Sequence, residues 1–207
     1  GNQYVYVCRG TVSGASIAYG TISVLSSSNN GFMPNISFDD NVTGSFVWQY
    51  FSSTDTESKS GAGTLSGDTW TIGATQVTPD SDSSNLVYLS PIHFSQTTAG
   101  VGAGCWYGTN GSTYGARAAA FSVSGTTLTW GTSSVIDTGD SPVATSPRMS
   151  FNPQDAGSFI TCNGETSAAG YDTNTYLSRI AISTSNLTAT NLLGIASAAI
   201  LDTATGT

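Results

Sequence analysis

The chain has 207 residues, of which 38% are hydrophobic and only 9% are charged, and its formal net charge is −8. An average soluble domain carries roughly 25% charged residues, so Ser, Thr, Asn and Gly replace charge over much of this chain. With only five basic residues, the chain lacks the Lys and Arg that neutralise phosphates, which argues against binding to nucleic acid or to an anionic bilayer.

The first predicted element, near residues 3–25, is a pair of strands joined by a turn at Ser13 and Gly14. The motif Ser-Gly-x-x-Φ-x-Φ-Gly, with Φ apolar or aromatic, begins there, recurs at Ser66 and Ser124, and has a degenerate copy at Ser185. We expect each Ser-Gly to be a hairpin turn in which Gly supplies a positive φ. Alternation predicts that residues three and five after each Gly share a half-buried face: Ile17, Tyr19, Trp70, Ile72, Leu128 and Trp130.

A second motif, Φ-x-Phe, alternates with the first and ends at Phe38, Phe94 and Phe151. The phenylalanines recur after 56 and then 57 residues, a period typical of propellers, solenoids and other arrays. In the strand before the second Ser-Gly turn, Gly61 and Gly63 alternate with other residues on one face, which predicts a close approach there.

Each repeat is expected to hold four antiparallel strands, two before and two around the Ser-Gly segment. The first strands are predicted near 34–39, 90–95 and 147–152, and the second near 45–51, 103–108 and 158–163. We therefore predict an all-β fold of repeated four-stranded antiparallel units in a β-propeller-like arrangement, with a trimeric intertwined β-fibre as the alternative.

The predicted β-repeat domain covers residues 1–191, with a half unit at 3–25 and full units at 32–78, 88–136 and 145–191. Residues 192–207 are expected to close the domain or to begin a following small β-module. The two strands that the half unit lacks would come from an upstream segment, a partner chain or residues 192–207. The longest apolar run, residues 192–201, is well short of the ~20 residues that span a bilayer, so no membrane insertion is expected.

The three cysteines are Cys8, Cys105 and Cys162. The second and third each follow a repeat phenylalanine by 11 residues, so they should lie one repeat apart, beyond the roughly 7 Å between Cα atoms that a disulfide allows. We expect all three to be small core residues and the last two to be buried thiols. No Cys/His spacing typical of zinc occurs, and no metal or cofactor is predicted.

Candidate catalytic groups are few. His93 is the only histidine and takes the position of Ser37 and Ser150 in the other units, so we expect a solvent-facing strand residue. Paired loop carboxylates should cap turns, although a cation site or a glycoside-hydrolysing pair are alternatives. These pairs are Asp39/Asp40, Asp80/Asp82 and Asp137/Asp140. Lys59 and Arg117, each eight residues before a motif Gly, are expected to make structural contacts to carbonyl groups or Asp.

Aromatic residues next to Asn, Asp and Ser are plausible sugar platforms. Trp48 and Trp106 take similar repeat positions on one face and are expected in the core. Tyr50 and Tyr107 are expected to be better exposed. The predicted glycan-binding residues are Tyr50, Tyr107, Tyr114 and Tyr171.

The segment Leu192-Leu193-Gly194-Ile195-Ala196-Ser197-Ala198-Ala199-Ile200-Leu201-Asp202-Thr203-Ala204-Thr205-Gly206-Thr207 resembles one found in tail fibre and tail-associated proteins of tailed bacteriophages, notably marine ones. There it follows Ser/Thr/Gly-rich β-repeats, which the preceding units resemble. The resemblance implies a virion component, usually a homotrimer, that contacts the host surface, and it carries no catalytic residues.

We therefore predict a non-enzymatic tail fibre or adhesin segment in a virion or extracellular setting. Its expected partners are a host surface glycan or receptor, other virion tail proteins and two further copies of itself. The alternatives are a free-standing carbohydrate-binding β-propeller and a polysaccharide depolymerase that uses the loop Asp residues.

Overall fold

A computed structural model describes residues 4–26, 31–80, 89–109, 114–137, 147–153, 158–167 and 170–181 of the chain. Its elements are antiparallel β-strands, which confirms the all-β class. The N-terminal hairpin consists of β1 (Val5–Ser13) and β2 (Ser16–Ser26). The first sheet contains β3 (Gly31–Phe38), β4 (Ser45–Ser52), β5 (Glu57–Ser66), β6 (Thr69–Ile72) and β7 (Gln76–Val77).

The second sheet contains β8 (Leu89–Phe94), β9 (Val101–Thr109), β10 (Tyr114–Ser124), β11 (Thr127–Trp130) and β12 (Ser134–Asp137). The third sheet contains β13 (Arg148–Phe151), β14 (Ser158–Ser167) and β15 (Gly170–Ala181). The first two sheets share one connectivity: four consecutive strands pair in chain order, and a short fifth strand pairs with the third of them. The strands predicted from the Φ-x-Phe motif are confirmed as β3, β8 and β13.

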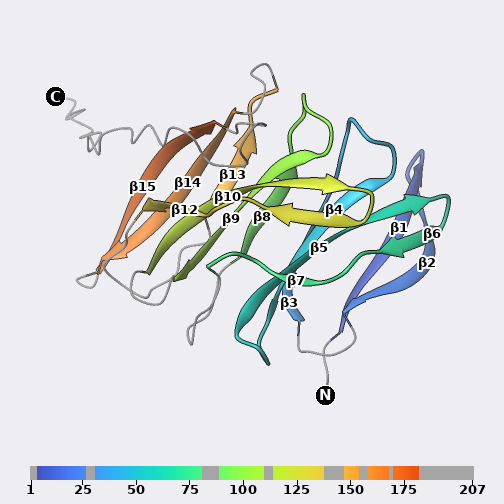
Figure 1. The fold of residues 1–207 in the computed structure, drawn as a ribbon, viewed down its shortest axis with the longest axis horizontal. Coiled ribbons are helices and arrows are strands. Elements are labelled where there is room, and N and C mark those ends of the chain that lie inside the picture. Colours follow the sequence, from blue (N-terminus) through green and yellow to red (C-terminus); the bar gives the residue numbers. More distant parts are fainter. Residues whose placement is uncertain are drawn as a thin grey trace.

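The hairpin and the three sheets stack face to face in a row that follows chain order, with the hairpin at one end and β15 near the other (Figure 1). A hydrophobic cluster fills each gap between neighbours. Within the described residues the row does not close into a barrel or ring, so the propeller arrangement stays a prediction.

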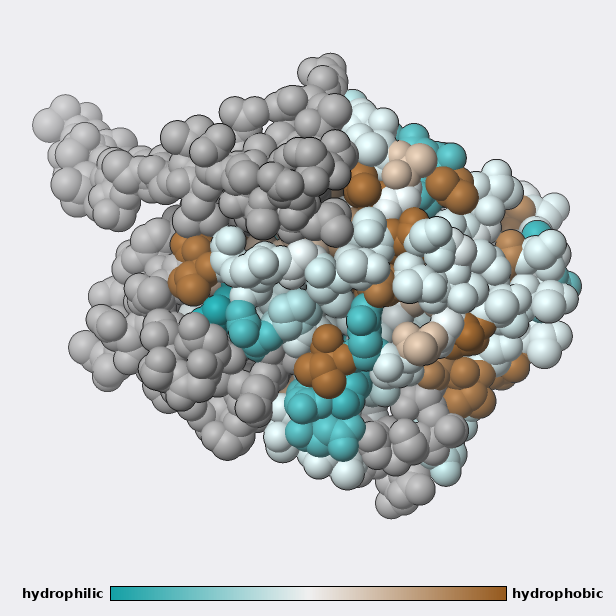
Figure 2. Space-filling model, in the orientation of Figure 1, coloured by the Kyte–Doolittle hydropathy of each residue, from teal (hydrophilic) through white to brown (hydrophobic). Residues whose placement is uncertain are grey.

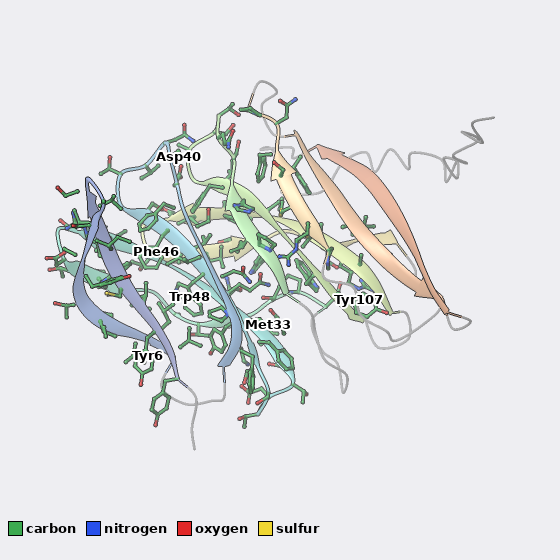
Figure 3. The ribbon with its side chains drawn as sticks, turned by 180° about the vertical axis from the view of Figure 1, so that it is seen from behind. Tyr6, Met33, Asp40, Phe46, Trp48 and Tyr107 are labelled. Atoms are coloured by element: carbon green, nitrogen blue, oxygen red, sulfur yellow. The ribbon has the colours of Figure 1, made fainter. Side chains whose placement is uncertain are left out.

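Most contacts in the clusters follow one rule: a sheet turns large side chains toward the sheet before it and smaller ones toward the sheet after it. Phe51 of the first sheet is an exception, because it packs with Trp106 and Ala119 of the second sheet. Phe46 and Trp48 of β4 lie between the hairpin and the first sheet, against Val5 and Val7 of β1 (Figure 3). The residues between them on β4 point the other way, so all eight positions of this strand are buried. Trp48 and Trp106 are both fully buried, as predicted.

The second and third gaps repeat this rule. Phe121 and Leu128 of the second sheet pack against Val47 and Ala62 of the first. Members of the cluster between the second and third sheets are Ala103, Cys105, Ala118 and Ala120 on one side and Met149, Phe151 and Phe159 on the other. Full burial of a side chain such as Phe stabilises a fold by roughly 1.5–3 kcal/mol, so these clusters hold the row together.

Aromatic rings also cover glycines within a sheet. Trp48 lies directly across from Gly61, and a Cβ at Gly61 would come within 2.3 Å of the indole ring. Phe46 covers Gly63 in the same way, with 2.5 Å to an added Cβ. In the second sheet Phe121 covers Gly102. The small residues were predicted to allow a close approach of backbone or sheet, but what lies closest over Gly61 is an aromatic ring of the neighbouring strand.

The three Ser-Gly turns have the predicted conformation. Gly14, Gly67 and Gly125 each have φ of 59°, and each begins a two-residue loop between paired strands. The second loop residue is not in the positive-φ region, which is the pattern of a type II′ hairpin turn. This turn matches the right-handed twist of the strands that it joins.

Asp39 ties the first sheet to the second. Its carboxylate is almost fully buried and accepts hydrogen bonds from the backbone N–H of Asn41 (2.8 Å) and of Gly100 (2.7 Å). The Asn41 side chain in turn donates to the carbonyl of Ser95 in the second sheet (3.0 Å). The predicted turn-capping role is thus confirmed for Asp39, and the link to a distant loop is an addition that the sequence did not show.

A buried polar network lies in the same gap. Gln49 donates to the hydroxyls of Ser58 (3.1 Å) and Thr78 (3.3 Å), and Thr78 donates to Ser60 (3.2 Å). Trp130 of the second sheet donates its indole N–H to the same Ser60 hydroxyl (2.9 Å). Because buried polar groups are costly unless they are hydrogen-bonded, this network favours one alignment of the two sheets.

The hairpin is too narrow to cover the first sheet completely. Ile92 and Phe94 of β8 are buried, whereas Ile36 and Phe38 at the corresponding positions of β3 are 44% and 45% exposed. The strand β8 lies against β3 and β4, but a two-stranded hairpin places no corresponding strands over β3. Of the three motif phenylalanines, Phe94 and Phe151 are therefore buried and Phe38 is not.

The cysteines differ from one another. Cys105 is a buried thiol, as predicted. Cys8 is exposed on β1, which contradicts the expectation of a core residue, and its thiol lies 3.3 Å from the carbonyl of Gly20. The side chain of Cys162 lies outside the described residues.

We predict that Gly61→Ala lowers the free energy of unfolding by about 1–3 kcal/mol, because the added methyl displaces the Trp48 ring. Urea denaturation of the single variants and of Gly61→Ala combined with Trp48→Leu measures this. The loss caused by Gly61→Ala should be smaller in the Trp48→Leu background. Additive losses would show that the ring contact is not the cause.

We predict that Asp39→Asn lowers the free energy of unfolding by about 1.5–3 kcal/mol, because the amide cannot accept from both backbone N–H groups. The neighbouring, exposed Asp40→Asn is the matched control and should change stability by less than about 0.5 kcal/mol. Hydrogen exchange should accelerate at Gly100 only in the first variant. Equal stability losses in both variants would contradict the proposed link.

Candidate functional site

The structure buries two of the four predicted glycan-binding tyrosines. Tyr50 is 2% exposed and stacks on Trp48 with ring centroids 5.8 Å apart, and Tyr107 is 7% exposed (Figure 3). The expectation that both are exposed is wrong, because β4 and β9 are central strands with a neighbouring sheet on each face. Neither ring can stack on a sugar in this arrangement.

The other two predicted tyrosines lie at turns. Tyr114 is the first residue of β10, across from Thr109 at the end of β9. Tyr171 is the second residue of β15 and follows Gly170, which pairs with Ser167 at the end of β14. Their side chains lie outside the described residues. Both backbone positions are therefore next to the turn between the second and third strands of a sheet.

The corresponding turn of the first sheet joins β4 to β5. Because the sheets stack in the same orientation, the strand ends that lead into the three turns lie along one side of the row (Figure 1). We call this side the turn rim and define it by the β4–β5, β9–β10 and β14–β15 turns. It brings Tyr114 and Tyr171 to a common side of the protein, although 57 residues separate them.

The β4–β5 turn is the described part of the rim, and it is polar. The Ser52 hydroxyl donates to the Asp55 carboxylate (3.0 Å), and Thr56 has a positive φ of 55°. Lys59 forms ion pairs with Glu57 (2.6 Å) and Asp55 (3.4 Å). Burial alone would lower the pKa of Lys59, but the carboxylates of Glu57 and Asp55 outweigh it and raise this pKa above its ordinary value.

The second recurring cation is buried. Arg117 is 2% exposed and forms an ion pair with Asp80 (3.4 Å), whose carboxylate also accepts a hydrogen bond from Ser133. The predicted structural contacts of Lys59 and Arg117 to Asp are therefore confirmed. The Asp80 carboxylate thus contacts both Arg117 and Ser133. Asp82, Asp140 and the side chain of Asp137 lie outside the described residues.

His93 is half-buried on β8, across from Ala103, rather than fully solvated as predicted. Burial lowers the pKa of His93 below its ordinary value. No cluster of three or more His, Cys, Asp or Glu side chains that could hold a metal ion occurs in the described residues. Among the described carboxylates, Asp39 caps a turn, and Asp55, Glu57, Asp68 and Asp80 form ion pairs.

An exposed apolar surface on the hairpin was not predicted. Six large side chains on the side of the hairpin facing away from the first sheet are between 45% and 76% exposed: Tyr6, Val12, Ile17, Tyr19, Ile22 and Val24. We call this surface the outer hairpin face. The expectation that Ile17 and Tyr19 are half-buried like Trp70 and Leu128 is wrong, because no described sheet precedes the hairpin.

The outer hairpin face is shallow and uncharged. Cys8 pairs with Ile22 within it, and with Tyr6 and Val7 these residues line a depression of about 230 Å³. Figure 2 shows hydrophobic residues at the hairpin end and at several other places on a surface that is mostly of intermediate hydropathy. Alternation in β1 and β2 marks the pattern in the sequence, but alternation does not show whether a face is covered.

Comparison of the chain with protein-family models, with curated proteins and with solved structures finds no match. The described residues contain no helical segment with the length and hydropathy that crossing a bilayer requires.

We predict that stability decreases as the pH falls below about 6.5, in part because of His93. Its pKa is lower in the folded than in the unfolded chain, so the unfolded chain binds the proton more readily and acid favours unfolding. The control variant is His93→Ser, because Ser occupies this position in the other two Φ-x-Phe motifs. Unfolding free energies between pH 5 and 7.5 should fall more steeply for the native chain, and parallel curves would contradict the prediction.

Proposed function

We propose that the chain is a non-enzymatic segment of a virion tail fibre or adhesin that attaches to host surface glycans through the turn rim. The observation that carries this proposal is the placement of Tyr114 and Tyr171 at corresponding turns on one side of a stack of sheets. Aromatic rings beside polar turn residues suit sugars, which present apolar C–H faces and hydroxyl groups together. Loops on a rigid scaffold are also where binding residues concentrate.

The contacts of the described carboxylates support the proposal that the protein is not an enzyme. Asp39 binds backbone N–H groups, Asp80 is paired with Arg117, and Asp55 and Glu57 are paired with Lys59. A glycoside hydrolase of the usual type needs two carboxyl groups about 5–9.5 Å apart on either side of a sugar. Carboxylates held in turns and ion pairs are poorly placed for that task.

We also propose that the units repeat in a propeller-like manner, with the hairpin as strands three and four of an incomplete unit. The shared strand order of the first and second sheets and their face-to-face stacking support this view. The resemblance further implies a virion or extracellular location, contact with other tail proteins and a homotrimer. The number of copies per particle can be measured by sedimentation equilibrium.

The proposal predicts that Tyr114→Ala and Tyr171→Ala each weaken glycan binding about 10-fold or more, since a stacked ring contributes of the order of 1–3 kcal/mol. A glycan array finds the ligand, and calorimetry then gives the affinity of each variant. Tyr19→Ala, an exposed tyrosine away from the rim, is the matched control and should leave the affinity per chain unchanged.

Two results would overturn the proposal. Affinity that is unchanged in both rim variants would remove the turn rim as the binding surface. Release of reducing ends when the native chain is incubated with host polysaccharide would show an enzyme instead, namely the depolymerase alternative.

A further inference from the structure

The turn rim contains acidic residues but no basic ones. Its three turns and the strand ends beside them cover residues 52–57, 109–114 and 165–172. These ranges contain no Lys or Arg, and their four acidic residues are Asp55, Glu57, Glu165 and Asp172. Because the chain as a whole carries a net charge of −8, an anionic molecule that approaches this side is repelled.

The two basic residues nearest the rim are already paired with carboxylates. Lys59 forms ion pairs with Glu57 (2.6 Å) and Asp55 (3.4 Å), and only 16% of its side chain is exposed. Arg117 is buried and forms an ion pair with Asp80 (3.4 Å). An acidic sugar could bind either cation only by replacing a carboxylate that the chain itself supplies.

The other three basic residues lie away from the rim. Arg9 binds Asp68 (2.9 Å) at the Ser-Gly turn, which is at the opposite end of β5 from the β4–β5 turn. Arg148 pairs with Cys162, five residues before the end of β14, and Arg179 pairs two residues further from that end. Five strand residues span roughly 16 Å, about twice the distance over which a charge acts at physiological salt.

The spacing of the sheets sets the length of a ligand for the rim. Tyr114 and Tyr171 belong to neighbouring sheets, and stacked sheets lie about 10 Å apart. This distance exceeds the width of one sugar ring. A glycan that contacts both positions therefore has to run across the strands, from one sheet to the next along the row (Figure 1).

We infer that the turn rim binds an uncharged, extended polysaccharide rather than an acidic one or a single terminal sugar. The inference rests on the proposed function and names the class of glycan. Thr54 and Thr56 are exposed in the β4–β5 turn and can bond to sugar hydroxyl groups. A carboxylate, sulfate or phosphate would lose water there without gaining a cation, which costs free energy. Asp55 and Glu57 do not select a cationic glycan, because Lys59 already neutralises part of their charge.

An array that carries each acidic polysaccharide in two forms tests the inference. One form is unmodified, and in the other the carboxyl groups are reduced to alcohols, so that the sugars and linkages are the same. The chain should bind uncharged polysaccharides, and it should bind a reduced form roughly 10-fold or more tightly than the acidic original. This difference should shrink as NaCl increases from about 0.05 to 0.5 M, because salt screens the repulsion.

Glu57→Gln tests whether the rim carboxylates cause the selectivity. It removes one negative charge and one ion-pair partner of Lys59, so the preference for the uncharged form should fall about two- to five-fold. Asp40→Asn is the matched control, because it removes the same charge from an exposed residue at the other end of β4, and it should leave the preference unchanged. Equal effects of the two variants would show that net charge, and not the rim, selects the glycan.

Oligosaccharides made by partial hydrolysis of a bound polysaccharide test the length. Affinity should increase about 10-fold or more between the monosaccharide and the shortest chain that reaches from one sheet to the next, because the longer chain contacts both Tyr114 and Tyr171. A monosaccharide that binds as tightly as the polymer would overturn the extended geometry.

Failure of this inference and failure of the proposed function give different results. If acidic polysaccharides bind as tightly as their reduced forms and Tyr114→Ala weakens that binding, the inference is wrong and the proposed function stands. A preference for an amino polysaccharide such as chitosan would overturn the inference in the same way. If no polysaccharide binds, or if Tyr114→Ala and Tyr171→Ala leave the affinity unchanged, the turn rim is not a glycan site and both fail.

Discussion

The packing of large side chains of one sheet on the smaller side chains of the sheet before it is the contact on which this fold depends. This packing decides which face of each strand is aromatic. It also buries β4, which lies next to the edge strand β3, along its whole length. The glycines follow from it, because a ring that lies flat over its own sheet needs Gly61 or Gly102 beneath it. Polar contacts then fix how neighbouring sheets align, through Asp39 and through the network around Ser60.

Local features of the fold could be predicted from the sequence. The Ser-Gly turns, the strands at the Φ-x-Phe motifs and the buried tryptophans all follow from alternation and turn chemistry, which act over a few residues. Burial of Tyr50 and Tyr107 could not be predicted in this way, because alternation within one strand does not show that a neighbouring sheet covers each of its faces. The exposure of Ile17 and Phe38 could not be predicted from the sequence either. Both residues have the sequence pattern of residues that are buried in the other units, and they differ from those residues only because no described strand covers them.

The candidate site shows the same limit. The sequence named Tyr114 and Tyr171 only as aromatic residues beside polar ones, and the strand registers show that both lie at the turn between the second and third strands of a sheet. The partners of the charged groups could not be predicted from the sequence. Asp80 and Arg117 are 37 residues apart, and Asp39 and Gly100 are 61 residues apart, so only the stacking of sheets brings them together. The turn rim and the outer hairpin face are separate surfaces, formed by different strands of the described residues.

The one-directional packing has a consequence for how the chain acquires its structure. Once one sheet has folded, its smaller side chains form the surface on which the aromatic rings of the next sheet can pack as that sheet leaves the ribosome. Strand pairing is local within each sheet, so each layer can form before the next is made. The hairpin is the exception, since no described sheet packs on its outward side chains.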